Sequence, residues 1–414
     1  MNMNKNIEIM APAGSFESLQ AAIKAGANSV YFGVEQLNMR ARSASFTLPD
    51  LKKVVEICNK KNIKTYLTLN TIMYDHDLIL MKKICDGAKK AGINAIIASD
   101  IAAMQYARSI DLEVHISTQA NVSNIEAVKF YSQFADIIVL ARELTLKQIK
   151  YICSMIQKEN IIGPSGNHVG IEVFCHGALC VAISGKCYMS LATFNASANR
   201  GACLQNCRRA YRVVDEETGD ELLIDNKYVM SPKDLCTISF LDQLLGTGLN
   251  VLKIEGRARS PEYVYTVTKS YREAVDSIIK GNYSQEKVEQ WIKQLETVYN
   301  RGFWHGGYYL GKTLGEWSNS YGSKASKEKQ FVGKVKNYFA KNNIAEIKIE
   351  AGFINQGSQL LVIGPTTGVV KSDAEKILRD DKKVDLAKKG DSITVKINEK
   401  VRKNDKVYIF SDRK

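Results

Sequence analysis

The chain has 414 residues, of which 45% are hydrophobic and 24% are charged. This composition is typical of a globular protein with one large core and room for a second, smaller domain. No apolar run reaches the length of about 18 residues that a transmembrane helix needs, and the start shows no apolar stretch of the kind found in secretory signals. We therefore expect a cytoplasmic protein without membrane contact, whose nine cysteines are reduced.

The net charge of +13 is unevenly distributed along the chain. Residues 321–414 carry 21 Lys and Arg against 12 Asp and Glu, whereas the first 320 residues carry 36 against 32. A basic appendage on a nearly neutral body suits a polyanionic partner such as a nucleic acid. A lysine-rich surface that only keeps the protein in solution is the alternative.

Short apolar segments alternate with amphipathic helical patterns over the first 280 residues. The expected strands are 7–11, 29–34, 64–70, 95–99, 113–119, 136–141, 170–174 and 250–255. Eight such units predict a (β/α)8 barrel of the TIM type, with an open doubly wound sheet as the alternative. The barrel would occupy residues 1–325, interrupted after its seventh strand.

That interruption contains a cysteine-rich stretch, residues 172–211, which we call the cysteine segment. A hairpin (211–215 with 221–225) and an apolar helix (235–245) should follow it. From residue 331 the pattern changes to short alternating strands separated by glycines and charged turns. Residues 326–414 are therefore expected to form a small antiparallel β-barrel domain, and its basic charge makes it the expected RNA contact.

Four cysteines of this segment, Cys180, Cys187, Cys203 and Cys207, have the spacing C-x6-C-x15-C-x3-C. Clustered thiols in a reducing compartment indicate a metal or cluster site. Zinc usually uses closer C-x2-C pairs, whereas an iron–sulfur cluster accepts ligands from separate loops. The spacing favours the cluster and leaves zinc open. Cys175 is a fifth thiol expected to point away, and the remaining cysteines are expected to be buried packing residues.

Polar residues stand where the expected strands end, which is where a barrel places its active site. The candidate catalytic residues are Asn70, Gln119, Glu172, His176 and Arg257. Each could instead cap a helix or close a salt bridge. A thiol–imidazole pair of Cys180 with His176 is also conceivable, although four clustered thiols are better explained as ligands.

The motif Glu172-x-Phe174-x-x-Gly177-Ala178-Leu179-Cys180, continued by Gly185-x-Cys187-x-Met189-Ser190, resembles the signature of the collagenase-like peptidases of family U32. The segments NRGACLQNCRRAY, SPKDLC, KIEGRARSPEYV and NRGFWHGGYY are also similar to that family, so that the resemblance covers essentially the whole chain.

The resemblance implies two different activities. The family name comes from a collagenase-like peptidase activity, but other members are oxygen-independent hydroxylases of a tRNA wobble uridine, a ribosomal RNA cytidine or the ubiquinone ring. Those members hold an iron–sulfur cluster through four cysteines, here Cys180, Cys187, Cys203 and Cys207, and take the hydroxyl group from prephenate.

A barrel with a basic C-terminal domain of this size is most similar to the tRNA branch. The resemblance thus implies a tRNA hydroxylase with a 4Fe–4S cluster, for which zinc could substitute, and prephenate as co-substrate. We expect Arg40, Arg42, Arg200 and Arg257 to bind this small dicarboxylate.

Overall fold

Eight parallel strands close into a barrel in a computed structural model, which describes residues 6–41, 46–183, 185–212, 214–221, 230–311, 316–318, 320 and 322–413. Neighbouring strands pair in chain order, and the last strand, β9, pairs with both β7 and β1, which closes the ring. The strands are β1 (Glu8–Pro12), β2 (Ser29–Phe32), β3 (Lys64–Leu69), β4 (Ala95–Ala98), β5 (Glu113–Ile116), β6 (Ile137–Val139), β7 (Gly170–Gly177) and β9 (Val251–Ile254). The expected TIM-type barrel is confirmed, and the open sheet is excluded.

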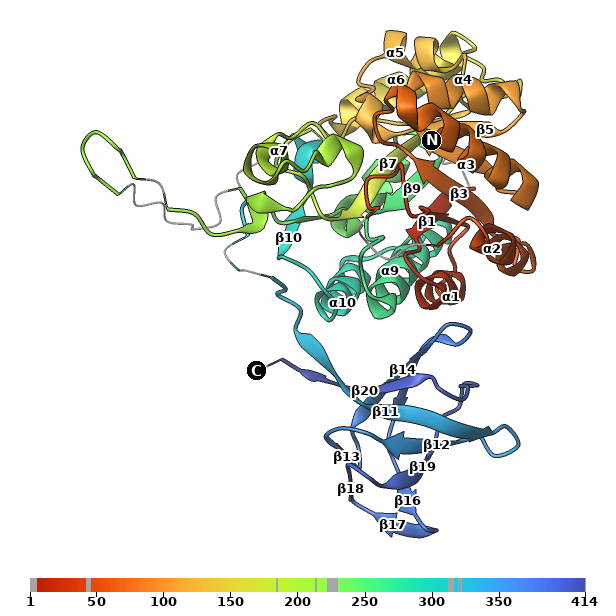
Figure 1. The fold of residues 1–414 in the computed structure, drawn as a ribbon, viewed down its shortest axis with the longest axis vertical. Coiled ribbons are helices and arrows are strands. Elements are labelled where there is room, and N and C mark those ends of the chain that lie inside the picture. The colour runs from red at the N-terminus through yellow and green to blue at the C-terminus, as the bar shows by residue number, and fades with distance from the viewer. Residues whose placement is uncertain are drawn as a thin grey trace.

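Helices surround this barrel on the outside (Figure 1). Those that follow the barrel strands are α1 (Phe16–Lys24), α2 (Asp50–Asn59), α3 (Leu78–Ala91), α4 (Ile101–Ser109), α5 (Ile125–Tyr131), α6 (Leu146–Lys158) and α9 (Pro261–Ile279). Several begin at a side-chain cap: Ser15, Asp100, Asn124 and Thr145 each accept a backbone N–H of the first turn. The caps fix where each strand-to-helix loop ends, and these loops form the mouth of the barrel.

The barrel interior is filled by side chains from its strands. A small buried cluster separate from the main core consists of Met10, Tyr31, Tyr66, Ala95, Ile97 and Val251. The larger core lies between strands and helices, and the single cysteines Cys58, Cys85, Cys153 and Cys236 are buried in it, as expected. The barrel is therefore a packed core, and its open end is where a ligand can bind.

The region between β7 and β9 differs in part from the expectation. The helix expected over 235–245 is wrong in its first half: β8 (Asp234–Cys236) pairs antiparallel with the end of β7, and only α8 (Leu241–Leu245) is α-helical. Asp234–Cys236 also pairs with β10 (Phe303–His305), which follows α10 (Gln285–Glu296). Strand pairing prevails over the helical pattern here, because β8 provides backbone hydrogen-bond partners for the end of β7. Of the expected hairpin, Val214 pairs with Glu221, and residues 222–229 lie outside the described residues.

The part of the cysteine segment that follows β7 lies against the barrel mouth, and the helices among its described residues are short: α7 (Met189–Phe194), η3 (Ala198–Arg200) and η4 (Asn206–Arg208). Glycines allow its closest approaches to the barrel. Gly177 has φ +107°, and a Cβ there would lie 2.6 Å from the backbone oxygen of Glu255. Gly201 has φ +86°, and a Cβ there would overlap the backbone oxygen of Asn38.

The C-terminal region is an antiparallel sheet around its own apolar core, as expected. Its eight strands lie in the order β15-β14-β20-β11-β12-β19-β16-β17, with β13 and β18 as a separate pair. Within the described residues, the two edge strands β15 and β17 do not pair with each other, so the hydrogen bonds between strands do not close this sheet into a ring. The strands are β11 (Lys327–Phe339), β12 (Ile344–Ile349), β13 (Phe353–Asn355), β14 (Gln359–Gly364), β15 (Gly368–Asp373), β16 (Ile377–Arg379), β17 (Lys382–Val384), β18 (Leu386–Lys388), β19 (Ser392–Lys396) and β20 (Lys406–Asp412).

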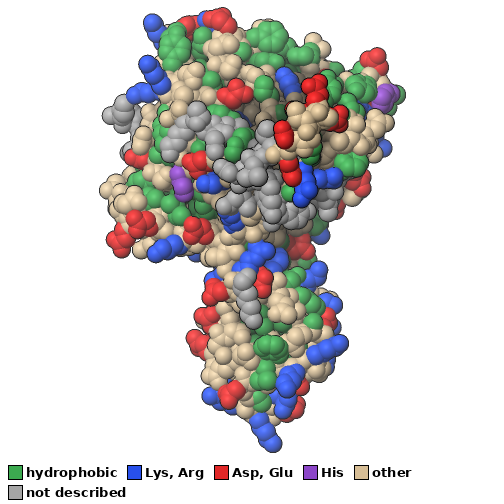
Figure 2. Space-filling view, turned by 90° about the vertical axis from the view of Figure 1, so that its left-hand side faces the viewer, with side chains coloured by type: hydrophobic (Ala, Val, Ile, Leu, Met, Phe, Trp, Pro, Cys, Tyr) green, Lys and Arg blue, Asp and Glu red, His purple; other side chains and the backbone are tan. Residues whose placement is uncertain are grey.

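This sheet lies beside helices α1 and α9 of the barrel, and the molecule is narrow where the two parts meet (Figures 1 and 2). Lys24 of α1 donates to the backbone oxygen of Val369 at 2.9 Å and pairs with Glu399 at 2.7 Å. Lys329 pairs with Glu262 of α9 at 2.8 Å. The contact is on the helical flank of the barrel, away from the β7–β9 insertion.

The close approach of Gly201 to Asn38 yields a prediction with a matched control. Gly219 has a similar φ of +74°, but no atom lies within 4 Å of the place that a Cβ would take there. Alanine at either site has a left-handed backbone cost of about 1–2 kcal/mol, and only Gly201→Ala adds a steric overlap. We expect Gly201→Ala to lower the midpoint of thermal unfolding clearly more than Gly219→Ala, measured by calorimetry. Equal shifts would contradict the proposed role of Gly201 in seating the cysteine segment.

Candidate functional site

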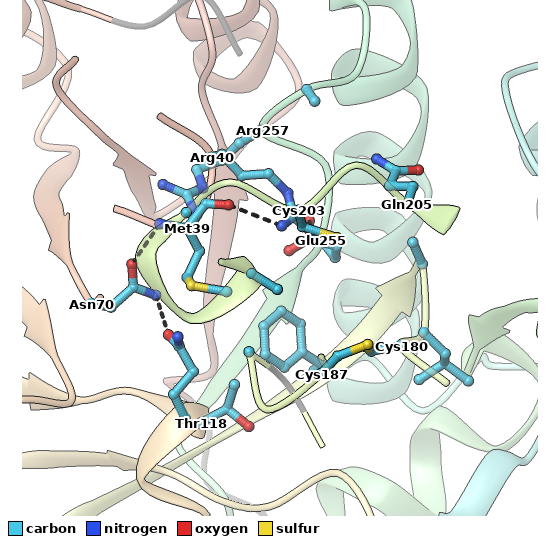
Figure 3. Close-up of a pocket in the computed structure, with 18 of the residues that line it drawn as sticks. Met39, Arg40, Asn70, Thr118, Cys180, Cys187, Cys203, Gln205, Glu255 and Arg257 are labelled. Carbon is cyan, nitrogen blue, oxygen red and sulfur yellow. Dashed lines mark hydrogen bonds and ion pairs between the residues drawn. The ribbon is translucent and has the colours of Figure 1, made fainter. Parts of the chain in front are cut away.

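A cavity of about 230 Å³ lies where the barrel strands end, between the barrel and the cysteine segment (Figure 3). Residues that follow four different barrel strands line it, among them Asn70, Gln119, Arg142 and Glu255. The opposite wall comes from the cysteine segment. The cavity thus occupies the mouth of the barrel, where this fold places its chemistry.

All four cysteines of the predicted ligand set line this one cavity. They reach it from separate loops: Cys180 follows β7, Cys187 precedes α7, Cys203 lies between η3 and η4, and Cys207 lies in η4. All four are half-buried, and Figure 3 shows Cys180, Cys187 and Cys203 along the cavity wall. Burial raises the pKa of the Cys207 thiol, the neighbouring Arg208 guanidinium opposes this shift, and the charges of the other three cysteines act in the same direction as burial.

The four sulfur atoms nevertheless do not form a ready site for one ion. Within the part of the chain that the structure describes, no three His, Cys, Asp or Glu side chains converge closely enough to hold a single metal ion. Cys175 does not line the cavity. Its sulfur is buried and lies 3.4 Å from the backbone oxygen of Lys253, so it points away from the other four, as expected.

Basic side chains greatly outnumber acidic ones around the cavity. Glu255 is the only carboxylate among its lining residues, and the cations are Arg40, Arg142, Arg208, Lys253, Arg257, Arg259 and Arg301. Three of these cations have a carboxylate partner: Arg40 with Glu255 at 3.2 Å, Lys253 with Glu172 at 2.6 Å, and Arg301 with Asp234 at 3.2 Å. The other four arginines have no ion pair with any described residue. The cavity is therefore strongly positive and suited to anions.

The pKa values of the buried groups reflect this positive field. Burial by itself would raise the pKa of Glu255, but nearby guanidinium groups, led by Arg40 and Arg142, hold that pKa below its ordinary value. Burial, together with the neighbouring charge of Arg40, lowers the pKa of Arg257 to about 10. Glu255 is thus ionised and Arg257 still protonated near neutral pH.

Three of the arginines without an ion pair are held in place by neutral partners. Arg257 donates through Nη1 to Asn38 at 3.1 Å and to Thr68 at 2.5 Å. Arg142 donates through Nη1 to the backbone oxygen of Ala178 at 3.0 Å and lies 3.9 Å from the ring centroid of Phe174. Arg259 stacks on Tyr299, with the guanidinium carbon 3.6 Å from the ring centroid. A guanidinium group held in this way can still bind a carboxylate ligand through two parallel hydrogen bonds.

A chain of amides forms another part of the wall. The Nδ2 of Asn70 donates to the Oε1 of Gln119 at 2.6 Å, and the Oδ1 of Asn70 accepts the backbone N–H of Met39 at 3.3 Å (Figure 3). Ser117 donates to the same Gln119 oxygen at 3.0 Å. The Nε2 of Gln119 lies next to Gly185 of the cysteine segment, 3.1 Å from the place that a Cβ would take there.

The structure brings together some predicted site residues and separates others. Asn70, Gln119, Arg40 and Arg257 line the cavity with the four cysteines. Glu172 does not line it. This carboxylate is fully buried within the barrel, bonded to Lys253, and its Oε2 lies 3.9 Å from the Nδ1 of His115.

Two further predicted residues face away from the cavity, and one cannot be placed. His176 is buried against Tyr263, Tyr271 and Phe303, and burial lowers its pKa to about 3, so that the ring is neutral. Arg200 forms a two-bond ion pair with Asp77, with N–O distances of 2.6 and 3.2 Å, and does not line the cavity. Arg42 lies outside the described residues.

Comparison with known proteins extends over the whole chain. Residues 14–319 match the model of the Peptidase family U32. A protein named collagenase from Porphyromonas gingivalis is 55% identical over the full length of both chains. A tRNA hydroxylation protein of Bacillus subtilis is 30% identical over 88% of this chain and 85% of its own, and the 23S rRNA 5-hydroxycytidine C2501 synthase of Escherichia coli is 34% identical over 72% and 44%.

The chain belongs to peptidase family U32. The resemblance that its cysteine motif suggested is therefore confirmed. Relatives in this family carry the names of peptidases and of RNA hydroxylases, which makes the U32 chain a member of an enzyme family. No helix among the described residues has both the length and the apolar character needed to cross a membrane.

Sequence reasoning missed several residues of the U32 cavity. Arg208, Arg259 and Arg301 belong to its positive lining but lie in a short 3-10 helix or in loops, where no strand or long helix pattern predicts the direction of a side chain. Arg208 donates to the backbone oxygens of Leu179 and Pro232, and so connects the cysteine segment to the residues that precede β8. The signal in the sequence was the position of these arginines within NRGACLQNCRRAY, KIEGRARSPEYV and NRGFWHGGYY, the segments that are similar to the family.

The Arg200–Asp77 pair predicts how stability depends on pH. The hydrogen bond from Arg200 holds the pKa of Asp77 below its ordinary value. The pair therefore stabilises the fold above the unfolded-state pKa of about 4 and loses this effect as pH falls through the lower folded-state pKa. Asp77→Asn should destabilise the protein by about 1–3 kcal/mol at neutral pH, and the difference from wild type should shrink in acid.

The measurement is thermal unfolding at a series of pH values. Asp75→Asn, in the same 3-10 helix η1 (Asp75–Asp77) but exposed, removes an equal charge and is the matched control. It should have little effect at any pH. If Asp77→Asn remains less stable than wild type by the same amount down to the lowest pH, loss of the ion pair is not the cause of the destabilisation.

Proposed function

We propose that this U32 chain is an oxygen-independent tRNA hydroxylase that converts a wobble uridine to its hydroxylated form, with an iron–sulfur cluster as cofactor and prephenate as hydroxyl donor. The observation that carries this proposal is the single cavity lined both by four cysteines and by four arginines without a carboxylate partner. The RNA hydroxylases among its relatives, 30% and 34% identical, support the reaction class.

The residues of the cavity fit a cluster better than a single ion. Four thiols from separate stretches of the cysteine segment line a cavity of about 230 Å³, and no three of the described ligand side chains converge on one point. A cluster spreads its ligands over several metal atoms. Burial raises the pKa of Cys207 and the other three thiols act in the same direction, so bound cationic iron would favour the thiolate form. When bound, the cluster supplies Lewis-acidic iron next to the hydroxyl donor.

The arginines have a separate task, which is to bind and orient the donor. Arg257, Arg142 and Arg259 line the cavity and have no ion pair with any described residue. Two of these groups can bind the two carboxylates of a small dicarboxylate and hold its hydroxyl group toward the cysteine side of the cavity. The field that keeps the Glu255 carboxylate ionised also favours a dianion over a neutral ligand.

The overall reaction replaces a C–H bond of the uracil ring by C–OH, which oxidises the base by two electrons. The donor gives up the hydroxyl oxygen and takes up those two electrons, so that no dioxygen is consumed. The amide chain of Asn70 and Gln119 lines the same cavity and can hydrogen-bond to the polar edge of a pyrimidine. The excess of lysines and arginines in residues 321–414 supports RNA as the partner, because phosphate contacts dominate RNA affinity.

A collagenase-like peptidase is the second candidate, favoured by the 55% identity to the protein named collagenase. None of the described histidines lines the cavity, and His176, the conceivable partner of Cys180, is buried elsewhere with a neutral ring. The cavity thus holds no thiol–imidazole pair of the kind that cysteine peptidases use.

The cysteine ligands can be tested by substitution. Anaerobically purified wild-type protein should contain iron and labile sulfide, and Cys180→Ala should lose most of both. Cells that contain only this variant should lack the extra oxygen in wobble uridine, which mass spectrometry of digested tRNA detects. Cys153→Ala, a buried cysteine remote from the cavity, is the control and should retain both properties.

The same two variants separate the candidate functions. An unchanged tRNA profile in cells without the protein would reject the hydroxylase. Cleavage of gelatin by the purified protein that persists in Cys153→Ala and is lost in Cys180→Ala would favour the peptidase.

The donor site yields a further prediction. Arg257→Lys keeps the charge but removes the forked donor geometry, so we expect the KM for prephenate to rise about tenfold or more, as for loss of about 1.4 kcal/mol or more of binding energy. Arg379→Lys, on the C-terminal sheet, should leave it unchanged. An unaltered KM for prephenate in Arg257→Lys would place the donor elsewhere.

A further inference from the structure

We propose that the outer face of the cysteine segment is a docking platform for a single-stranded RNA loop, whose bases stack on exposed aromatic rings around the cavity. This inference rests on the proposed function, which supplies the premise that the substrate is an RNA. It adds where the RNA binds and which part of its structure is recognised, and it assigns the main loop contact to this segment instead of the C-terminal sheet.

The platform consists of aromatic side chains that a soluble protein normally buries. Three belong to the segment: Tyr188, Phe194 and Tyr211 are 79%, 49% and 37% exposed. A fourth, Tyr74, is 52% exposed and lies against Arg200 of the segment, with the guanidinium carbon 4.0 Å from the ring centroid. Half of the eight exposed large aromatic side chains among the described residues thus lie on or against this stretch.

The charge of the same stretch selects a polyanionic partner. Between residues 173 and 214 there is no Asp or Glu, and the five charged residues are Lys186, Arg200, Arg208, Arg209 and Arg212. Lys186, Arg209 and Arg212 are exposed. The guanidinium of Arg209 lies 5.1 Å from the ring centroid of Phe194, and Arg212 pairs with Glu221 at 3.5 Å. Figure 2 views the molecule from the side that carries this segment.

The rings stand on a backbone that is fixed by hydrogen bonds. The hydroxyl of Tyr211 donates to the backbone oxygen of Asn206 at 2.8 Å, and the Asn206 amide donates to the backbone oxygen of Met189 at 3.2 Å. Tyr188 is the residue before α7 and lies between Cys187 and Met189, both of which line the cavity. A base stacked on Tyr188 is therefore next to the cavity entrance, which connects the platform to the proposed chemistry.

A loop fits this surface better than duplex RNA or a protein. In an A-form duplex the base faces are stacked inside the helix, so they cannot reach protein aromatic rings, whereas unpaired loop bases can. Protein interfaces are also rich in aromatic rings and arginines, so charge decides between the two kinds of partner. Arg209 lies against Phe194, and Arg200, which is also paired with Asp77, lies against Tyr74. Residues 173–214 contain no Asp or Glu, which suits bases and phosphates.

The experiment measures binding of two RNA probes to the full-length protein. One probe is a hairpin with an unpaired, uridine-containing loop, and the other is a fully paired duplex of equal length. Tyr188→Ala and Phe194→Ala should each weaken hairpin binding about tenfold, the scale of one lost base–aromatic stack, and leave duplex binding unchanged. Tyr151→Ala removes a ring of comparable exposure, 57%, from α6 and should change neither.

The outcomes are decisive in both directions. If Tyr188→Ala and Phe194→Ala bind the hairpin with the wild-type affinity, the platform is overturned. It is also overturned if these variants lose the same amount of affinity for the hairpin and for the duplex, because that result would indicate phosphate contacts only. Tyr188→Trp, which keeps a stacking surface, should retain the affinity, and because Tyr188 is mostly exposed its substitution leaves the fold intact. The binding assay requires no hydroxylation, so a protein that binds the loop but leaves tRNA unmodified refutes the proposed reaction and not the platform.

Discussion

Uncompensated positive charge at the barrel mouth is the constraint on which the rest of this structure depends. Seven cations and one carboxylate line a cavity that is closed on one side by the packed barrel interior. Lys253, Arg301 and Arg40 are paired with carboxylates, whereas the remaining four arginines have no ion pair among the described residues. Of these four, Arg257 is buried and the others are half-buried. Desolvation of an unpaired charge is unfavourable, so thiolates and a bound dianion would stabilise this site.

The cysteine segment can form this cavity only because it is held close to the barrel at several points. Gly177 and Gly201 bring its backbone against Glu255 and Asn38. Arg208 bonds to Leu179 and Pro232, and Arg200 bonds to Asp77. The segment has little regular structure of its own, so these contacts take the place of secondary structure in fixing the four sulfur atoms. Arg200 thus positions the segment although it was expected to bind a ligand.

The fold was predictable because period-two and helical patterns alternate along the barrel, and the cysteines were recognisable by their clustering. The site was predictable only in part. The rule that functional side chains stand at the ends of barrel strands identified Asn70, Gln119 and Arg257. It failed on β7, where the predicted residues do not line the cavity. The pairing of β7 with β9 shifts register between Phe174 and His176, so that His176 does not share the face of Phe174 and lies against α9. Three-residue strands such as β16 are too short to show any period.

The positive groups of this protein fall into two sets with different physical consequences. Arginines in the cavity are removed from water, so a small dianion that they can enclose gains more from them than an RNA phosphate that stays hydrated at the surface. Arg209 and Arg212 on the outer face are screened by salt and attract a polyanion over a longer range without fixing it. In the proposed platform, the exposed aromatic rings would supply contacts that depend on unpaired bases. Two substrates of like charge would then be sorted at one barrel mouth, with the enclosed arginines selecting the small anion and the exposed face selecting the nucleic acid.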